Sequence, residues 1–296
     1  LVGRDLISAV RSFFLTSYMP RQTNATVISL IPKIAGASAL TDFRPVSLCN
    51  TVYKIISKTL SARLKTITQD TVQRNQVGFV KGRVLCENVL LASELVADFH
   101  KRGRITKGCL QVDISKAFDS IKWGFILNIL IAFNLPLVFI SWIQACITTP
   151  YYSVALNGEL SGFFPGKKGL RQGDSISSSL FVMAMDILSK ELDIAVREGK
   201  FGAHPSCLDP LVTHLSFADD LLIFFDGTSN SLRGILTVLR DFQKSTGLAL
   251  NLRKTCVFVN GENSEASASL ASEFGITMGS LPVKYLGLPL IPHKAR

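Results

Sequence analysis

The sequence predicts a mixed α+β fold, and two kinds of pattern indicate it. Short, β-rich apolar runs, such as residues 27–33 and the two runs within residues 214–225, predict buried strands. Longer stretches with an apolar residue every three or four positions, such as residues 50–67 and 175–199, predict amphipathic helices. With 296 residues and no internal repeat, the chain is long enough to bury a sizeable core.

The composition is that of an ordered globular protein with a polyanionic partner. Hydrophobic residues make up 47% of the chain and charged residues 18%, which excludes a disordered segment. The 32 basic and 22 acidic residues give a net charge of +10. Residues 33–107 hold 13 of the basic and 5 of the acidic residues, a local charge of +8. This clustering favours a nucleic-acid-binding face over a nonspecific basic surface, which stays the alternative.

Cysteine spacing and hydropathy argue against three other classes. The six cysteines lie far apart and form no C-x-x-C pair, which disfavours a zinc site, and a disulfide framework is not expected in a chain of this size. Residues 125–142 come nearest to a membrane span, but Pro136 would interrupt it. We therefore expect two buried segments joined at residues 134–136, and no membrane partner.

Two adjacent carboxylates, Asp219 and Asp220, stand between the apolar runs of residues 214–225. Aspartate tolerates the dihedral angles of a tight turn, so the pair predicts the tip of a β-hairpin. Charge beside buried strands is costly without a partner, and a divalent cation is the usual one. The stretch thus suggests a magnesium site, although a solvated Asp-Asp turn explains it equally well.

A third carboxylate, Asp113, follows the strand predicted over residues 109–112. Two metal ions about 4 Å apart, bridged by carboxylates, can activate a 3′-hydroxyl and stabilise a leaving pyrophosphate. Such a centre needs acidic ligands from separate strands. The sequence supplies these residue types, and their meeting in space is an inference.

Two glycine-containing stretches could approach an anion. Residues 78–83 form a basic turn bracketed by Gly78 and Gly82, a weak pattern by itself. Residues 169–175 open the helix predicted over 175–199, where the positive end of the dipole and Arg171 suit a phosphate. For the second stretch, a well-capped core helix is the alternative interpretation.

The rest of the chain completes the predicted order. Residues 1–26 are expected to form a flanking helix and linker. Helices are predicted at 86–100, 232–247 and 264–274, strands at 248–251 and 255–259, and a strand-like turn at 283–290.

Eight stretches together resemble, in order, the reverse transcriptases of non-LTR (LINE-type) retrotransposons, in a plant-like form. The resemblance covers about residues 27–290. The stretches are Leu30-Ile31-Pro32-Lys33, Phe43-Arg44-Pro45-Val46-Ser47-Leu48, residues 78–83, residues 113–119, residues 169–174, Phe217-Ala218-Asp219-Asp220, residues 247–255 and Tyr285-Leu286-Gly287.

The resemblance implies a right-hand polymerase whose antiparallel palm sheet is backed by helices. It places the fingers at about residues 27–108 and 125–165 and the palm at about 109–124 and 166–290, between flanks at 1–26 and 291–296. The thumb is expected to be missing, as are an endonuclease, an RNase H domain and a zinc knuckle. The chain therefore looks like a slice of something longer.

The implied activity is RNA-directed DNA synthesis. A primer 3′-hydroxyl would be extended with dNTPs on an RNA template by two-metal-ion chemistry, with two Mg²⁺ ions and Mn²⁺ as a substitute, in the service of retrotransposition. A nuclear location is implied as well. The alternative is a catalytically silent retroelement relic that binds nucleic acid, and the missing thumb leaves open whether the slice alone is active. An RNA-dependent RNA polymerase is disfavoured by the bulky Phe118.

Residue roles follow from the resemblance. The resemblance assigns metal binding and catalysis to Asp113, Asp219 and Asp220. Phe118 would be the steric gate against a ribose 2′-hydroxyl. Nucleotide binding is expected at Lys33, Arg44, Phe118, Gln172, Gly173 and Lys254, and nucleic-acid binding at Lys81, Arg83, Arg171, Tyr285, Leu286 and Gly287. After Asp174 the family usually has Pro-Leu-Ser-Pro, whereas this chain has Ser175-Ile176-Ser177-Ser178, which should loosen the start of the helix.

Overall fold

The computed structural model describes residues 2–100, 106–260 and 264–292, so most of the predicted flank 291–296 lies outside the described residues. The chain forms two compact units. The first unit comprises residues 1–70 and 118–184, and the second unit comprises residues 71–117 and 185–296. These bounds differ from the division into fingers and palm expected from the sequence, which stays a prediction about functional subdomains.

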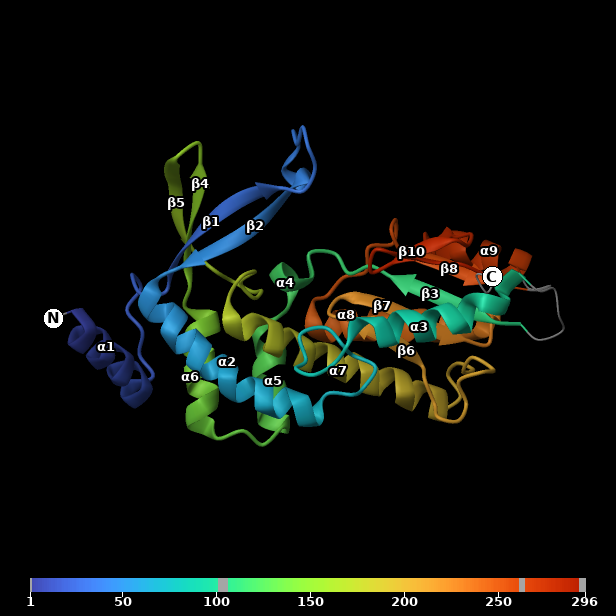
Figure 1. Ribbon diagram of the computed structural model, residues 1–296, viewed down its shortest axis with the longest axis horizontal. Coiled ribbons are helices and arrows are strands. Elements are labelled where there is room, and N and C mark those ends of the chain that lie inside the picture. Colours follow the sequence, from blue (N-terminus) through green and yellow to red (C-terminus); the bar gives the residue numbers. More distant parts are fainter. Residues whose placement is uncertain (1, 101–105, 261–263, 293–296) are drawn as a thin grey trace. The chain divides into compact units, whose positions relative to one another are not determined.

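A four-stranded sheet in the order β2-β1-β4-β5 dominates the first unit (Figure 1). β1 (Ala25–Pro32) and β2 (Phe43–Cys49) form an antiparallel pair, so the predicted strand at residues 27–33 is confirmed. β4 (Tyr151–Leu156) runs parallel to β1 and antiparallel to β5 (Glu159–Pro165). The β4–β5 hairpin was not predicted, although Asn157-Gly158 at its tip is a strong hairpin signal.

The helices of the first unit are α1 (Val2–Thr16), α2 (Thr51–Thr71), α4 (Ala117–Ser120), α5 (Trp123–Ala132) and α6 (Leu137–Thr148), with a 3₁₀ turn, η1, at Leu40–Asp42. The two segments predicted on either side of residues 134–136 are thus confirmed as α5 and α6. α7 (Ser175–Arg197) begins in the first unit and ends in the second. Among the described residues, no helix combines the length and the apolar character that crossing a membrane requires.

The second unit is built on a five-stranded sheet in the order β6-β7-β3-β8-β9. Its strands are β6 (His214–Phe217), β7 (Asp220–Phe225), β3 (Gly108–Val112), β8 (Cys256–Val259) and β9 (Thr277–Met278). The first four pair antiparallel, as predicted, and only β9 pairs parallel to its neighbour. β7 is buried from Leu221 to Phe225, so both of its faces are covered.

One face of this sheet packs against α3 (Leu85–Val96) and the hairpin of β10 (Val283–Tyr285) and β11 (Leu288–Leu290). A 3₁₀ turn, η2 (Ala97–His100), extends α3. The shared core comprises Val89, Ala92, Leu95, Val96, Cys109, Cys207, Leu215, Leu222, Phe224, Phe258, Tyr285 and Leu290.

The remaining helices of the second unit are α8 (Ser229–Thr246) and α9 (Ser264–Phe274), close to their predicted positions. Gly247 ends α8 with a φ of 82°, a left-handed conformation that glycine adopts without steric cost. The strand predicted at residues 248–251 is wrong. This segment is a loop in which Leu250 forms an isolated β-bridge with Ile114.

Candidate active site

Asp219 and Asp220 lie at the tip of the β6–β7 hairpin, as the sequence predicts. Phe217 pairs with Asp220, which leaves Ala218 and Asp219 to form the turn. Ala218 is buried, with 3% of its surface exposed, and its φ is 56°. The apolar residues on both sides build two strands, and the short connection directs the carboxylates to one end of the sheet.

Asp113 reaches the same end of the sheet. β3 and β7 are antiparallel and Val112 pairs with Leu221, so the next register position sets Asp113 opposite Asp220. The pKa of the Asp220 carboxyl is raised by burial and then by the charges of Asp219 and Asp113. Three acidic side chains therefore share one local electrostatic environment.

The donor set fits a divalent cation that substrate helps to bind. Within the described residues, no three His, Cys, Asp or Glu side chains form a group that could hold an ion alone. Mg²⁺ typically uses one or two carboxylates and completes its shell with water and substrate phosphates. Like-charged carboxylates that raise the pKa of a neighbour are the environment that a bound cation stabilises.

A basic turn is attached to the backbone of Asp113. Asn251 donates its backbone N–H to the Asp113 carbonyl oxygen at 2.8 Å, and Lys254 donates its own to the Asn251 carbonyl at 3.0 Å. The Lys254 side chain is exposed. The loop at residues 248–251 thus leads into a turn that holds the predicted nucleotide-binding Lys254 near Asp113, which directly follows β3.

In the first unit, Lys33 and Arg44 lie on one hairpin. Lys33 follows β1 directly, and Arg44 in β2 pairs with Ile31. Both side chains are exposed, and the Lys33 ammonium donates a hydrogen bond to the Thr41 carbonyl at 2.9 Å. Two cations on an exposed hairpin can bind a phosphate group.

Phe118 and the glycine turn at residues 169–173 are joined through their backbones. Leu170 donates its N–H to the Phe118 carbonyl at 2.6 Å. A Cβ at Gly169 would lie 2.7 Å from the Asp119 carbonyl oxygen, so only glycine allows this approach. The half-buried Phe118 ring stacks on Phe181, with centroids 4.6 Å apart.

Gln172 lines a cavity of about 250 Å³ in the first unit, together with residues of β1, β2, β4 and β5 and with Lys167 and Lys168. Its backbone carbonyl accepts a hydrogen bond from Ser47 at 2.9 Å. Its side-chain Oε1 is buried and has no hydrogen-bond partner among the described residues. Gln172 therefore combines a place in the cavity lining with a buried acceptor that has no partner among the described residues. Gly173 is exposed beside it.

Arg171 is a correction to the sequence prediction. It was expected to bind nucleic acid, but only 5% of its surface is exposed. Its guanidinium donates to Asn24 at 2.8 Å, to Thr26 at 3.1 Å and to the Cys146 carbonyl at 2.9 Å, and it pairs with Asp174 at 3.5 Å. Arg171 therefore anchors the turn that carries Gln172 and Gly173.

Asp174 completes this buried network at the start of α7. Its carboxylate accepts hydrogen bonds from Tyr53, at 2.5 Å, and from Ser57, both on α2. The Ser61 hydroxyl donates to the Ser175 carbonyl at 2.8 Å. These contacts hold the helix start at which the family's prolines are replaced.

Two further side chains that were predicted to bind nucleic acid also form contacts within the protein. Arg83 donates to the backbone carbonyls of Val72, Gln73 and Gln76. Tyr285 is 1% exposed and belongs to the core. Burial, and then the charge of Asp220, raises the pKa of its hydroxyl. Tyr285 therefore packs in the core, whereas Arg83 is half-buried and its contact with nucleic acid stays a prediction.

The remaining members of that predicted group can meet solvent. Lys81 and Gly287 are exposed, and Leu286 is half-buried. Leu286 and Gly287 form the β10–β11 turn with φ values of 52° and 86°. Their contact with nucleic acid stays a prediction.

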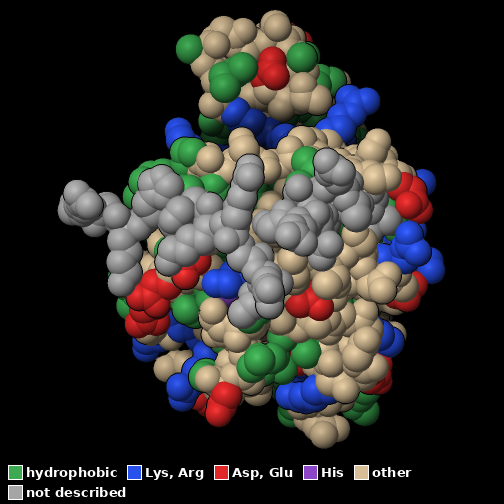
Figure 2. All heavy atoms as spheres, turned by 90° about the vertical axis from the view of Figure 1, so that its right-hand side faces the viewer, with side chains coloured by type: hydrophobic (Ala, Val, Ile, Leu, Met, Phe, Trp, Pro, Cys, Tyr) green, Lys and Arg blue, Asp and Glu red, His purple; other side chains and the backbone are tan. Residues whose placement is uncertain are grey.

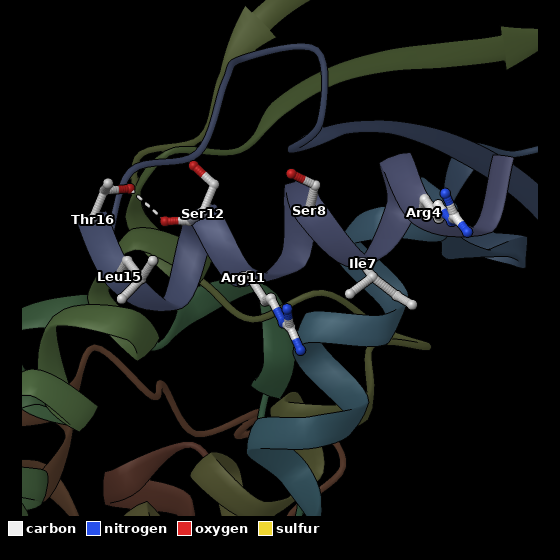
Figure 3. A pocket seen from close by; sticks show the side chains of 7 residues that line it. All are labelled: Arg4, Ile7, Ser8, Arg11, Ser12, Leu15 and Thr16. Carbon is white, nitrogen blue, oxygen red and sulfur yellow. Dashed lines mark hydrogen bonds between the residues drawn. The ribbon is translucent and has the colours of Figure 1, made fainter. Parts of the chain in front are cut away.

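Neither the surface charge nor a hollow outside the predicted residues identifies the functional site. Figure 2 shows Lys and Arg side chains interspersed with Asp and Glu among the described residues of the face that it presents. On this face, therefore, net charge alone does not mark a binding surface. A hollow along α1 in the first unit is lined by Arg4, Ile7, Ser8, Arg11, Ser12, Leu15 and Thr16, none of which was predicted to be functional (Figure 3).

Sequence comparison identifies the family. The family model described as reverse transcriptase (RNA-dependent DNA polymerase) matches residues 31–290. The chain belongs to this reverse transcriptase family. It is 25% identical over 289 residues to a Transposon TX1 protein of Xenopus laevis, covering 96% of the chain, and 28% identical over 284 residues to the Pol polyprotein of the R2DM element of Drosophila melanogaster, covering 91%. It spans only 20% and 25% of the lengths of these two relatives.

Solved structures agree with this assignment of fold. Telomerase from Candida tropicalis, solved with a fragment of telomeric RNA, gives a TM-score of 0.61 at 13% identity, over 98% of the chain and 48% of the telomerase. The apo telomerase truncated from its C-terminal domain gives 0.57 at 14% identity, over 87% and 56%. The predicted right-hand polymerase fold is thereby confirmed. The reverse transcriptase family uses divalent metal ions, in keeping with the carboxylates of the second unit.

Sequence reasoning missed the residues that hold the site in place. The Arg171–Asp174 network was not predicted, because both residues lie in a stretch that was interpreted as an anion-binding motif. Gln76, buried near the hairpin tip, also escaped notice. Gln76 stands two residues before Gly78 of the predicted basic turn, and that proximity was the available signal.

Proposed function

We propose that the chain is the polymerising part of an RNA-directed DNA polymerase that extends a DNA primer with dNTPs on an RNA template. The observation that carries this proposal is the strand register that sets Asp113 opposite Asp220, next to Asp219, in a chain of the reverse transcriptase family. The polymerase would serve retrotransposition, and we place it in the nucleus.

In this proposal Asp113 and Asp219 hold two Mg²⁺ ions, for which Mn²⁺ can substitute, and Asp220 supports them. When bound, the ions favour ionisation of the primer 3′-hydroxyl and stabilise charge on the departing pyrophosphate. The Asp113 and Asp219 carboxylates would hold the cations, because Asp113 directly follows the short, buried strand β3 and Asp219 lies in the turn before β7.

Other residues bind the nucleotide and the template. Lys33 and Arg44 bind the triphosphate, and Lys254 neutralises charge near the leaving group. Phe118 excludes a ribose 2′-hydroxyl. Gln172, with its unpaired acceptor, and Gly173 position the template-side base pair. The exposed side chains of the two cations on the β1–β2 hairpin and the buried acceptor of Gln172 support these assignments.

Primer extension by the full-length protein tests the proposal. An RNA template, an annealed DNA primer, dNTPs and Mg²⁺ should give extended DNA, and EDTA should abolish it. Asp113→Asn should lower the rate at least about a hundredfold, since it removes one charge from the cation site. RNA binding without any metal-dependent incorporation by the wild type would instead establish a catalytically silent relic.

A further inference from the structure

The Gln76 side chain hydrogen-bonds to both polar groups of Ala218. Its Oε1 accepts the N–H of Ala218 at 2.9 Å and the N–H of Gly78 at 2.9 Å. Its Nε2 donates to the Ala218 carbonyl at 3.3 Å. Gln76 has 0% of its surface exposed, so water does not compete for these bonds. A side chain 142 residues away thus replaces the backbone partners that a turn residue lacks.

Ala218 needs such support because its backbone is strained. Ala218 has a φ of 56°, and a Cβ makes this left-handed conformation less favourable than the right-handed region. Ala218 precedes Asp219 directly, so the orientation of its peptide sets the direction in which the Asp219 side chain leaves the turn. Relaxation of Ala218 to a negative φ would rotate that side chain away.

The segment that carries Gln76 is itself fixed to β6. Val77 donates its N–H to the Ser216 carbonyl at 3.0 Å, and Ser216 donates to the Asn75 carbonyl at 2.9 Å. Gly78 approaches the hairpin so closely that a Cβ there would lie 2.4 Å from the Ala218 nitrogen. The Gln76 carbonyl, in turn, accepts a hydrogen bond from Arg83 at 2.6 Å.

We propose that Gln76 is a positioning residue for the catalytic hairpin, which clamps the Ala218 peptide and thereby aims the Asp219 carboxylate. The inference rests on the proposed polymerase function, in which Asp219 is catalytic. It also explains why a basic-looking turn at residues 78–83 lies beside the hairpin. Arg83 and Gly78 hold the clamp in place.

Gln76→Met tests the clamp in the full-length protein, because methionine fills a similar volume and offers neither donor nor strong acceptor. We expect kcat for dNTP incorporation to fall between about tenfold and a hundredfold, with KM for dNTP changed less than about threefold. Adding Ala218→Gly should restore at least about a third of the lost kcat, since glycine adopts a positive φ without strain.

Asn88→Ala is the matched control. Asn88 is buried and donates to the Asn75 and Ser216 carbonyls, so its loss loosens the same segment without touching Ala218. It should lower the melting temperature about as much as Gln76→Met while leaving kcat within about threefold of wild type.

Amide hydrogen exchange gives a second readout that needs no catalysis. In the protein without substrate, the Ala218 amide should exchange at least about tenfold faster in Gln76→Met than in wild type, and remain slow in Asn88→Ala. Wild-type kcat in Gln76→Met, or a failure of Ala218→Gly to rescue it, would overturn the positioning role. If wild type itself incorporates no nucleotide, the polymerase function fails, and unchanged exchange at Ala218 would overturn the clamp separately.

Discussion

At the residue scale, the side chains that hold this site are more informative than those that were first expected to act in it. Arg171 and Tyr285 lie in motifs that suit nucleic acid, yet both are buried and serve the fold. Their motifs could be found from sequence because the residue types and their order are distinctive. Their roles could not, because burial depends on residues far along the chain, such as Asn24 for Arg171.

Arg171→Lys should destabilise the protein by about 2–4 kcal/mol. Lysine keeps the charge but cannot bond Asn24, Thr26 and Cys146 from one planar group, and it leaves Asp174 partly unpaired in a buried position. Urea denaturation measures the loss. Arg63→Lys, at an exposed position, should stay within about 0.5 kcal/mol of wild type. Equal stabilities of the two variants would contradict the structural role of Arg171.

Phe118→Ala should admit ribonucleotides. The substitution removes the ring that would block a 2′-hydroxyl and leaves its stacking partner Phe181 in place. We expect the preference for dNTP over rNTP, measured as the ratio of kcat/KM values, to fall at least about tenfold, or 1.4 kcal/mol. The rate with dNTP serves as the internal control. Unchanged sugar discrimination would count against the gate.

At the element scale, short strands and their turns carry the candidate catalytic residues. Some of these elements could be predicted from the sequence and others could not. The β6–β7 hairpin and β3 could be read from sequence, because an apolar run ending in aspartate is a local pattern. The β4–β5 hairpin was missed because β5 is exposed along its whole length and shows no alternation of buried and exposed residues. The loop at residues 248–251 was taken for a strand since two of its leucines suggested one.

The β1–β2 hairpin yields a prediction about nucleotide affinity. Arg44→Ala should raise KM for dNTP about tenfold with a smaller effect on kcat, because a charge-assisted contact with the triphosphate contributes about 1.5–3 kcal/mol. Lys54→Ala, on the exposed face of α2, is the control and should leave KM unchanged. Steady-state kinetics at varied dNTP concentration gives KM for both variants. Equal KM values would show that Arg44 does not bind the nucleotide.

At the scale of the whole molecule, the fold class could be predicted because eight motifs recur in a fixed order. The antiparallel sheet and the polymerase architecture were both confirmed. The bounds of the compact units could not be predicted, since they depend on which segments pack together, as residues 71–117 do with residues 185–296. Packing between distant segments produces no local pattern in the sequence.

Stability should fall as the pH drops below 6.5. Burial lowers the pKa of His204 from 6.5 to about 4, and burial also lowers the pKa of His214. The folded state therefore binds fewer protons than the unfolded state between pH 4 and 6.5. Each histidine's contribution is complete above pH 6.5 and is lost toward pH 4, at about 1.4 kcal/mol per pH unit.

His204→Phe tests this pH dependence. The ring stacks beside Phe99 and phenylalanine preserves its shape, so the variant should lose the titration together with the hydrogen bond that the Ser206 N–H donates to His204 Nδ1, and the pH dependence separates the two effects. Between pH 6.5 and 4.5, the free energy of unfolding of the variant should fall less steeply than that of wild type, by about 1.4 kcal/mol per pH unit. Identical slopes in urea titrations at several pH values would show that His204 titrates normally in the folded protein.

Single-turnover incorporation of one dNTP by Asp219→Asn and Asp226→Asn tests the central claim most directly. Asp219 lies at the turn before β7 and Asp226 directly follows its other end, where an asparagine oxygen can still accept the Thr228 N–H. If the carboxylates at the hairpin tip form the catalytic centre, Asp219→Asn should be slower than wild type by at least about a thousandfold, while Asp226→Asn keeps its rate within about threefold. Undiminished incorporation by Asp219→Asn would contradict the account.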